Sequence, residues 1–291
     1  MHQRQSTGVP ELDTLLGGGL IPGTLTVVLG ATGIGKTQLG VQYAHAGLVQ
    51  EGRRGVLLDM SSRGDSQGHA AYARRICQWE LQPADGLPQG ADLYAPHTRL
   101  GDYLHVFDYT GRRVTRGEVE PEAWHAWQVE LVRKLNAALG FLYGNLVRGV
   151  RRVVVDGVEP STRAADSVQL ELFEYVSHQV LRKEAQWVAR DFLRERYRQH
   201  AALAEAHAYA QQEVGCLLLY TTAESMLEEL VARRVEEGDV LANANTIICM
   251  GRVRRAAGLG RALCVIKHRG SRSAEEFVPF TIDDGGLRVD A

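Results

Sequence analysis

Short runs of apolar residues recur along the chain, separated by longer segments in which apolar residues return every three or four positions. The short runs predict buried strands, and the longer segments predict helices with one buried face. Strands are predicted at 26–29, 55–60, 103–109, 151–156, 215–222, 246–250, 261–267 and 277–282. Helices are predicted at about 36–48, 67–79, 121–142 and 224–237. Predicted strands and helices therefore alternate along much of the chain.

Two segments depart from this alternation. Residues 81–101 are rich in Pro, Gly and Asp and have little periodicity, which predicts a long surface loop. Residues from about 164 to 212 favour helix over an unusual length, so we expect a long helix or helical hairpin. This segment either projects as an arm toward a partner or neighbouring subunit, or is a solvated helix face with ion pairs between turns.

The strand at 26–29 leads into a glycine-rich segment that matches a phosphate-binding loop. Residues 30–37, GATGIGKT, fit the P-loop pattern G-x-x-x-x-G-K-[ST] at every fixed position, and a helix is predicted to follow. Glycines let backbone N–H groups turn toward a phosphate, and the helix N-terminus adds its positive dipole. The residues expected to bind the nucleotide are Gly30, Ala31, Thr32, Gly33, Ile34, Gly35, Lys36, Thr37 and Gln38. Lys36 supplies charge for the β- and γ-phosphates, and the Thr37 hydroxyl is expected to ligate Mg²⁺.

A second candidate for the metal site ends the strand at 151–156. The sequence RRVVVD closes its β-branched run with Asp156, which is the pattern of a Walker B strand once a P-loop precedes it. In a doubly wound sheet, ligands bind at the carboxyl ends of the strands, where this aspartate is expected. The sequence therefore predicts that Asp156 holds Mg²⁺ directly or through water.

The composition and charge of the chain argue against some functional classes but do not identify the function. The chain has 291 residues, 45% hydrophobic and 23% charged, enough for one large or two small folded domains. A formal net charge of -2 gives no general attraction to nucleic acids or acidic membranes. No run approaches the ~18 apolar residues of a membrane span, and the start, MHQRQSTGVP, lacks a signal-peptide core. We therefore expect a cytoplasmic protein with no membrane partner, whose four cysteines are buried and reduced.

Before the P-loop strand, residues 8–23 read GVPELDTLLGGGLIPG, a short helix followed by a glycine run. The strand RRVVVD and the segment KHRGS at 267–271 complete a set of motifs spread along the chain. In this order they resemble the KaiC and RadA branch of the RecA-like ATPases, and the resemblance covers nearly the whole chain. It implies one RecA-like P-loop NTPase domain over residues 1–291. That α/β fold is a mostly parallel twisted sheet with helices on both faces and antiparallel C-terminal strands, here with the extended helical arm at about 164–212.

The resemblance also implies a function. KaiC-like proteins bind ATP with Mg²⁺ and assemble into oligomeric rings with nucleotide at subunit boundaries, so we expect a homo-oligomer, most simply a hexamer. Lys267 and Arg269 match the Lys and Arg that reach the neighbouring subunit's γ-phosphate, and join Lys36 and Asp156 as candidate catalytic residues. The implied activity is that of an ATPase or a nucleotide-dependent switch that signals to an unidentified protein partner.

Two positions near the expected γ-phosphate need separate comment. The second strand of KaiC-like proteins commonly ends in two glutamates, one of which polarises the attacking water, and the matching residues here are Ser61 and Ser62. A serine has no carboxylate to act as a base near neutral pH, so we expect slow hydrolysis. The strand at 215–222 carries a γ-phosphate sensor in this family, and Thr221 or Thr222 fits that role or that of a helix cap.

A second hypothesis is a DNA-binding recombination accessory protein of the RadA or RecA-paralogue type. Arg252, Arg254, Arg255 and the helical arm would then contact phosphates. The loops after Asp156 and Thr222 lack the glycine-rich, basic composition expected of DNA-binding loops. Four glutamates make one of these loops acidic: Glu228, Glu229, Glu236 and Glu237. Nucleic acid is therefore the less favoured partner.

Overall fold

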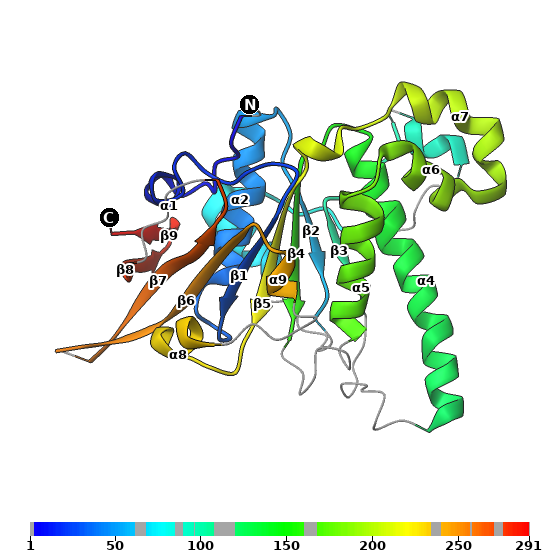
Figure 1. The fold of residues 1–291 in the computed structure, drawn as a ribbon. Helices are drawn as coiled ribbons and strands as arrows, with labels where there is room; N and C mark the ends of the chain where they lie inside the picture. Colours follow the sequence, from blue (N-terminus) through cyan, green and yellow to red (C-terminus); the bar gives the residue numbers. More distant parts are fainter. Residues whose placement is uncertain are drawn as a thin grey trace.

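The computed structural model describes residues 3–61, 68–84, 90–95, 97–107, 120–159, 168–233, 240–256, 258–270 and 276–290. Within them, one nine-stranded sheet has the order β3-β2-β4-β5-β1-β6-β7-β8-β9 (Figure 1). Its strands are β1 (Leu25–Gly30), β2 (Val56–Asp59), β3 (Tyr103–His105), β4 (Arg152–Val158), β5 (Gly215–Thr221), β6 (Thr246–Arg255), β7 (Gly258–His268), β8 (Val278–Asp283) and β9 (Gly286–Val289). In this sheet order, each neighbouring pair between β3 and β6 is parallel, and each neighbouring pair between β6 and β9 is antiparallel. The predicted α/β class and sheet type are confirmed.

Helices cover both faces of the sheet, as predicted (Figure 1). They are α1 (Pro10–Leu15), α2 (Lys36–Gln50), α3 (His69–Cys77), α4 (Pro121–Leu146), α5 (Val168–Val176), α6 (Ala185–Leu193), α7 (Tyr197–Ala206), α8 (Leu227–Ala232) and α9 (Val240–Asn243). On one face, α1 to α3 share a core with β8 and β9, which includes Leu12 and Leu39. On the other face, α4 to α7 share a core that includes Phe141 and Phe173. Strands buried on both faces explain the continuous apolar runs in the sequence.

The segment expected to be an extended helical arm is a packed helical layer. Residues 168–206 form three α-helices, joined through a π-helical turn at Ser177–Leu181 and a 3-10 turn at Arg194–Arg196. The chain changes direction at Arg194, whose φ of 49° is left-handed and interrupts the helix. Val188 and Ala204 are buried in the same core as α4, so the expectation of a projecting arm is wrong for the described helices. Residues 160–167 lie outside the described residues.

Part of the predicted surface loop at 81–101 is buried. A 3-10 helix forms at Gly90–Tyr94, and Leu93, Tyr94 and Leu100 belong to the core that contains α4. Arg148, just after α4, fixes this segment by donating to the carbonyl oxygens of Leu93 and Ala95 at 2.7 Å each. The buried apolar residues of this segment are too few to show a helical or strand-like periodicity. The sequence pattern therefore predicted a surface loop.

Other element boundaries are shorter than expected. Strand β3 ends at His105 instead of continuing to 109, and helix α8 covers only Leu227–Ala232 of the expected 224–237. Positions 108–109 and 234–237 of those predictions lie outside the described residues. Among the described helices, none combines the length and apolar character needed to cross a membrane.

Candidate nucleotide and metal site

The P-loop joins the end of β1 to the start of α2, at the carboxyl edge of the parallel strands. Gly35 precedes α2 with a φ of 121°, a conformation that favours glycine over any residue with a Cβ. The first backbone N–H groups of α2 therefore face the loop without partners from the helix itself. A cavity of about 230 Å³ opens here and is lined by Thr32, Gly33, Gly35, Lys36, Thr37, Gln38, Tyr72, Asp156 and Thr221.

Lys36 folds back across the loop, where two predicted loop residues hold it. Its Nζ donates to the carbonyl oxygens of Gly30 at 2.8 Å and Ala31 at 3.0 Å. The side chain is only 6% exposed, and burial lowers its pKa to about 8, although the charge of Asp156 acts in the opposite direction. A buried ammonium bonded only to neutral carbonyls gains strongly from a phosphate oxygen. Ile34, the remaining loop residue, is buried in the core beside α2.

Thr37 and Asp156, the two predicted metal ligands, are brought together. The Thr37 hydroxyl donates to Asp156 Oδ2 at 2.7 Å, and the Gly157 N–H donates to Asp156 Oδ1, also at 2.7 Å. Gly157 has a φ of 80°, and a Cβ there would lie 2.3 Å from the Ser61 nitrogen, so β2 and β4 can approach only because this residue is glycine. A hydroxyl and a carboxylate at the rim of a phosphate cavity fit the few protein oxygens that Mg²⁺ uses beside a nucleotide.

A buried histidine, which the sequence analysis did not identify, completes this cluster. His69 is the first residue of α3 and is 1% exposed. Its Nε2 lies 3.0 Å from Asp156 Oδ2, and its Nδ1 lies 3.5 Å from Asp59 Oδ2. Burial alone lowers the pKa of His69, but the hydrogen bond and charge of Asp156, with the charge of Asp59, raise it above its ordinary value. The same contacts, with Thr37 and Lys36, hold the pKa of Asp156 low despite its burial.

No motif spacing marks His69, because it is a single histidine after a glycine. The available signal is positional: Asp59 and Asp156 lie on neighbouring parallel strands and are register partners. Two carboxylates side by side in a buried edge need positive charge or hydrogen-bond donors. Such a pair could have prompted a search for a basic residue in the segment that follows β2.

Ser61 lies at the end of β2, and it is absent from the described lining of the cavity. It is fully buried; its N–H donates to Asp59 Oδ1 at 2.9 Å, and its Oγ lies 3.3 Å from His105 Nε2. Ser62 lies outside the described residues. Of the two threonines proposed as sensors, Thr221 lines the cavity, whereas the buried Thr222 donates its hydroxyl to the Glu224 carbonyl at 3.0 Å.

Lys267 and Arg269 lie away from their own P-loop. Lys267 pairs with Ile247, which pairs with Val27 in the first half of β1, whereas the P-loop follows the end of β1. The ammonium of Lys267 donates to the carbonyl oxygens of Leu241 and Ala242, at 3.3 Å each. Arg269 is exposed beyond the end of β7. The structure therefore separates these two residues from Lys36 and Asp156 within one chain.

Comparisons with known proteins agree with this geometry. Residues 5–71, which contain the P-loop and His69, match the family model described as "ATPase: KaiC". The chain is 24% identical over 285 residues to the circadian clock protein KaiC2 of Synechocystis sp., which covers 97% of this chain. A KaiC-like protein from Pyrococcus horikoshii has the same fold over 99% of both chains, with a TM-score of 0.50 and 16% identity. The chain is thus similar to KaiC-type ATPases, through the family model in its first quarter and through KaiC2 along nearly its whole length.

The curated relatives are longer than this chain. It spans 39% of the length of KaiC2. It also shares 48% identity over 48 residues with the DNA repair protein RadA of Mycobacterium tuberculosis, a match to 16% of this chain and 10% of RadA.

Proposed function

We propose that this KaiC-like chain binds Mg·ATP between its P-loop and Asp156, and that the bound nucleotide controls assembly of a homo-oligomeric ring. The observation that carries the nucleotide site is the 2.7 Å hydrogen bond from Thr37 to Asp156 beside the inward-turned Lys36. It joins the helix that follows the P-loop to the end of the Walker B strand. These are the groups that a phosphate–metal pair needs within one cavity.

Each residue has a distinct part in binding. The backbone N–H groups of the loop and of the first turn of α2 receive phosphate oxygens. Lys36 exchanges its two carbonyl partners for the β- and γ-phosphates, because a charged acceptor forms the stronger hydrogen bond. Thr37 and Asp156 hold Mg²⁺, which when bound neutralises charge on the β- and γ-phosphate oxygens.

The ring is supported by the position of Lys267 and Arg269. Both lie near the amino-terminal edge of β1, so they cannot readily reach the cavity of their own chain. In a ring, the same two residues would face the nucleotide of the neighbouring subunit and supply positive charge to its γ-phosphate. Bound nucleotide would then control assembly, and assembly would complete each nucleotide site with residues of the neighbouring subunit. The ring would present this state to an unidentified protein partner.

The nucleotide site is tested by isothermal calorimetry with Mg·ATP. Lys36→Ala removes the ammonium from the cavity, so affinity should fall at least about 100-fold, on the order of the strength of a charge-assisted contact. Lys183→Ala is a matched control, because this lysine is 40% exposed and pairs with Asp191 on the surface. Equal affinity of wild type and Lys36→Ala would contradict the proposed site.

A second candidate function, nucleic-acid binding, is favoured by one observation. The long β6–β7 hairpin projects from the sheet (Figure 1) and exposes four arginines: Arg252, Arg254, Arg255 and Arg261. Arg252 and Arg261 are cross-strand partners, a like-charge pair that an anion would stabilise. If these side chains contact phosphates, single-stranded DNA binding should weaken with salt, with a log–log slope of about -0.7 per contact. Loss of this slope in Arg252→Ala/Arg261→Ala supports the role, and absence of binding by wild type at low salt excludes it.

A further inference from the structure

His69 lies wedged between two carboxylates at the point where α3 begins. Its ring is 1% exposed, and its two nitrogens face Asp156 on β4 and Asp59 on β2. The two nitrogens are not equivalent. Nε2 is at hydrogen-bond distance from Asp156 Oδ2, 3.0 Å, whereas Nδ1, at 3.5 Å from Asp59, is a buried atom without a hydrogen bond among the described residues. The specific contact of His69 is therefore the one to Asp156.

The carboxylate of Asp156 is fixed on both of its oxygens. Oδ1 accepts from the Gly157 N–H at 2.7 Å, and Oδ2 accepts from both the Thr37 hydroxyl and His69. When Thr37 turns its hydroxyl oxygen toward a metal, its hydrogen bond to Oδ2 is lost. His69 then remains as the side-chain donor that keeps Oδ2 on the cavity side. Without it, the carboxylate can rotate away from the metal position.

Asp59 lies beside the His69 ring, and both of its carboxylate oxygens already accept hydrogen bonds from other residues. Its Oδ1 accepts from the Ser61 N–H at 2.9 Å, and its Oδ2 accepts from the Tyr103 hydroxyl at 2.7 Å. It is fully buried, so its charge acts on the His69 ring through a medium that screens poorly. A carboxylate oxygen accepts hydrogen bonds, so at 3.0 Å from Asp156 Oδ2 the Nε2 of His69 is the donor.

Helix α3 sets the position of the ring relative to the P-loop helix. Tyr72, one turn after His69, lines the nucleotide cavity. Arg75 donates to Gln38 Oε1 on α2 at 3.1 Å, which ties the two helices together. The start of α3 is thus held against the element that carries Thr37.

We propose that His69 is a positioning residue for the metal of the bound nucleotide. Its Nε2–H holds Asp156 Oδ2 toward Thr37, so that the hydroxyl and carboxylate oxygens meet Mg²⁺ already oriented. The inference rests on the proposed Mg·ATP site. Outer hydrogen-bond partners of this kind are worth about 10- to 100-fold in metal affinity.

Two substitutions separate the two nitrogens of the ring. The amide nitrogen of His69→Gln falls near the position of Nε2 and can still donate to Asp156. The amide nitrogen of His69→Asn falls near Nδ1 and reaches only toward Asp59. We expect His69→Gln to keep the wild-type affinity within about threefold and His69→Asn to lose about 10- to 100-fold. The measurement is electron paramagnetic resonance of free Mn²⁺ during titration into the protein saturated with a non-hydrolysable ATP analogue.

Affinity for the analogue in the presence of EDTA should be the same in wild type and both variants. Circular dichroism and thermal melting show whether each variant is folded. Equal Mn²⁺ affinity of folded His69→Asn and wild type overturns the inference. Failure of the wild type itself to bind the analogue instead overturns the proposed function.

A measurement on the wild type keeps the test decisive if His69→Asn does not fold. In ¹⁵N-histidine spectra, the Nε2 of His69 should carry a proton both before and after addition of Mg²⁺ and the analogue. A deprotonated Nε2 in the loaded protein would mean that His69 does not donate to Asp156, which also overturns the positioning role.

Discussion

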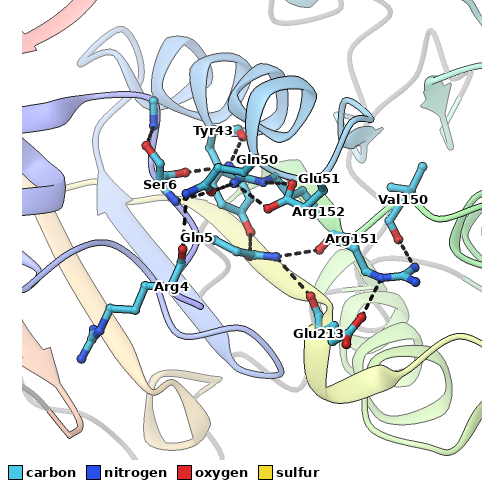
Figure 2. A network of polar contacts seen from close by, with 11 residues as sticks. Arg4, Gln5, Ser6, Tyr43, Gln50, Glu51, Val150, Arg151, Arg152 and Glu213 are labelled. Carbon is cyan, nitrogen blue, oxygen red and sulfur yellow. Dashed lines mark hydrogen bonds and ion pairs between the residues drawn. The ribbon is translucent and has the colours of Figure 1, made fainter. Parts of the chain in front are cut away.

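Arg152 and Glu51 form a two-pronged ion pair at the edge of the sheet opposite the nucleotide cavity. The Arg152 Nε and one terminal nitrogen donate to the two carboxylate oxygens of Glu51 at 2.8 and 2.9 Å. Figure 2 shows the network around the guanidinium, which also donates to the carbonyl oxygens of Ser6 and Tyr43, at 2.6 and 2.8 Å. Arg152 starts β4, the strand that carries Asp156, and Glu51 follows the helix that begins at Lys36. The pair therefore links the two elements that build the site.

Loss of this pair should unfold the protein at a markedly lower urea concentration. Arg152 is fully buried, and Arg152→Met leaves Glu51 and two backbone carbonyls without their donor, a loss of about 3–5 kcal/mol. Its sequence neighbour Arg151 is the control, since it pairs with the half-exposed Glu213 at 3.2 Å. Arg151→Met should cost less than about 1 kcal/mol. Equal decreases in the free energy of unfolding in the two variants would show that the buried ion pair stabilises the fold no more than the exposed one.

The cysteines should react slowly with alkylating agents in the native protein. Burial disfavours the thiolate, so it raises the pKa of Cys77 to about 11 and those of Cys216 and Cys249 to about 12. At pH 8, roughly one Cys77 side chain in a thousand is then ionised. Labelling by iodoacetamide should rise about tenfold per pH unit between pH 8 and 10, and should be fast at pH 8 in guanidinium. Three cysteines are buried as expected, whereas Cys77 is half-buried; fast native labelling at pH 8, read by mass spectrometry, would contradict these environments.

Subunit mixing tests the trans role of Lys267 and Arg269. Lys36→Ala subunits have an impaired P-loop but intact Lys267 and Arg269, and Lys267→Ala/Arg269→Ala subunits have the reverse. Because the two groups lie apart within one chain, each mixed boundary can hold one complete site. Nucleotide-dependent assembly, measured by light scattering, should be lost in each variant alone and partly recovered in the mixture.

A matched control for the mixing experiment is Arg288→Ala, which removes an exposed arginine that pairs with Asp283 on the surface. This variant should assemble as the wild type does. A wild type that stays monomeric with ATP at every concentration would leave Lys267 and Arg269 without a neighbour to reach. Recovery that never exceeds the sum of the separate variants would also refute the trans role.

The sequence predicted the parts of the fold that depend on the local pattern of residues. Strands β1 and β4 are buried on both faces, so their apolar runs are continuous, and the P-loop has fixed residue types because each contacts phosphate or turns the backbone. The break at Arg194 could not be predicted in this way. It is set by the burial of Val188 and Ala204 against residues far along the chain, which helix propensity does not record.

The residues of the candidate site also differ in whether a local sequence motif identifies them. Lys36, Thr37 and Asp156 were identified because their motifs fix their spacing, and the structure brings them to one cavity. His69 entered the site only through three-dimensional proximity, since the segment between β2 and α3 has no pattern that points its side chain at Asp156. Ser61 was identified from its place after β2, but its burial beside His105 depends on the adjacent strand β3.

Turnover tests the absence of a carboxylate at positions 61 and 62, which follow β2 in the sequence. We expect slow phosphate release, because Ser61 is buried, its Oγ faces His105, and it can neither polarise nor deprotonate water. Asp59 cannot readily substitute, since both of its oxygens already accept hydrogen bonds from Ser61 and Tyr103. Asp59→Asn should therefore not remove a catalytic base.

Restoring the carboxylate should raise turnover. The longer side chain of Ser61→Glu extends beyond the Ser61 hydroxyl, and the nearby His105 offers its charge a partner, which limits the penalty of burial. A positioned base contributes about 10²–10⁴-fold, so even partial success should give roughly tenfold faster steady-state phosphate release. Ser61→Gln, which has the same length without the charge, is the matched control and should leave the rate unchanged. Brisk wild-type turnover that survives in Asp59→Asn and does not increase in Ser61→Glu would show that the water is oriented from another position, and that slow hydrolysis is not a property of this chain.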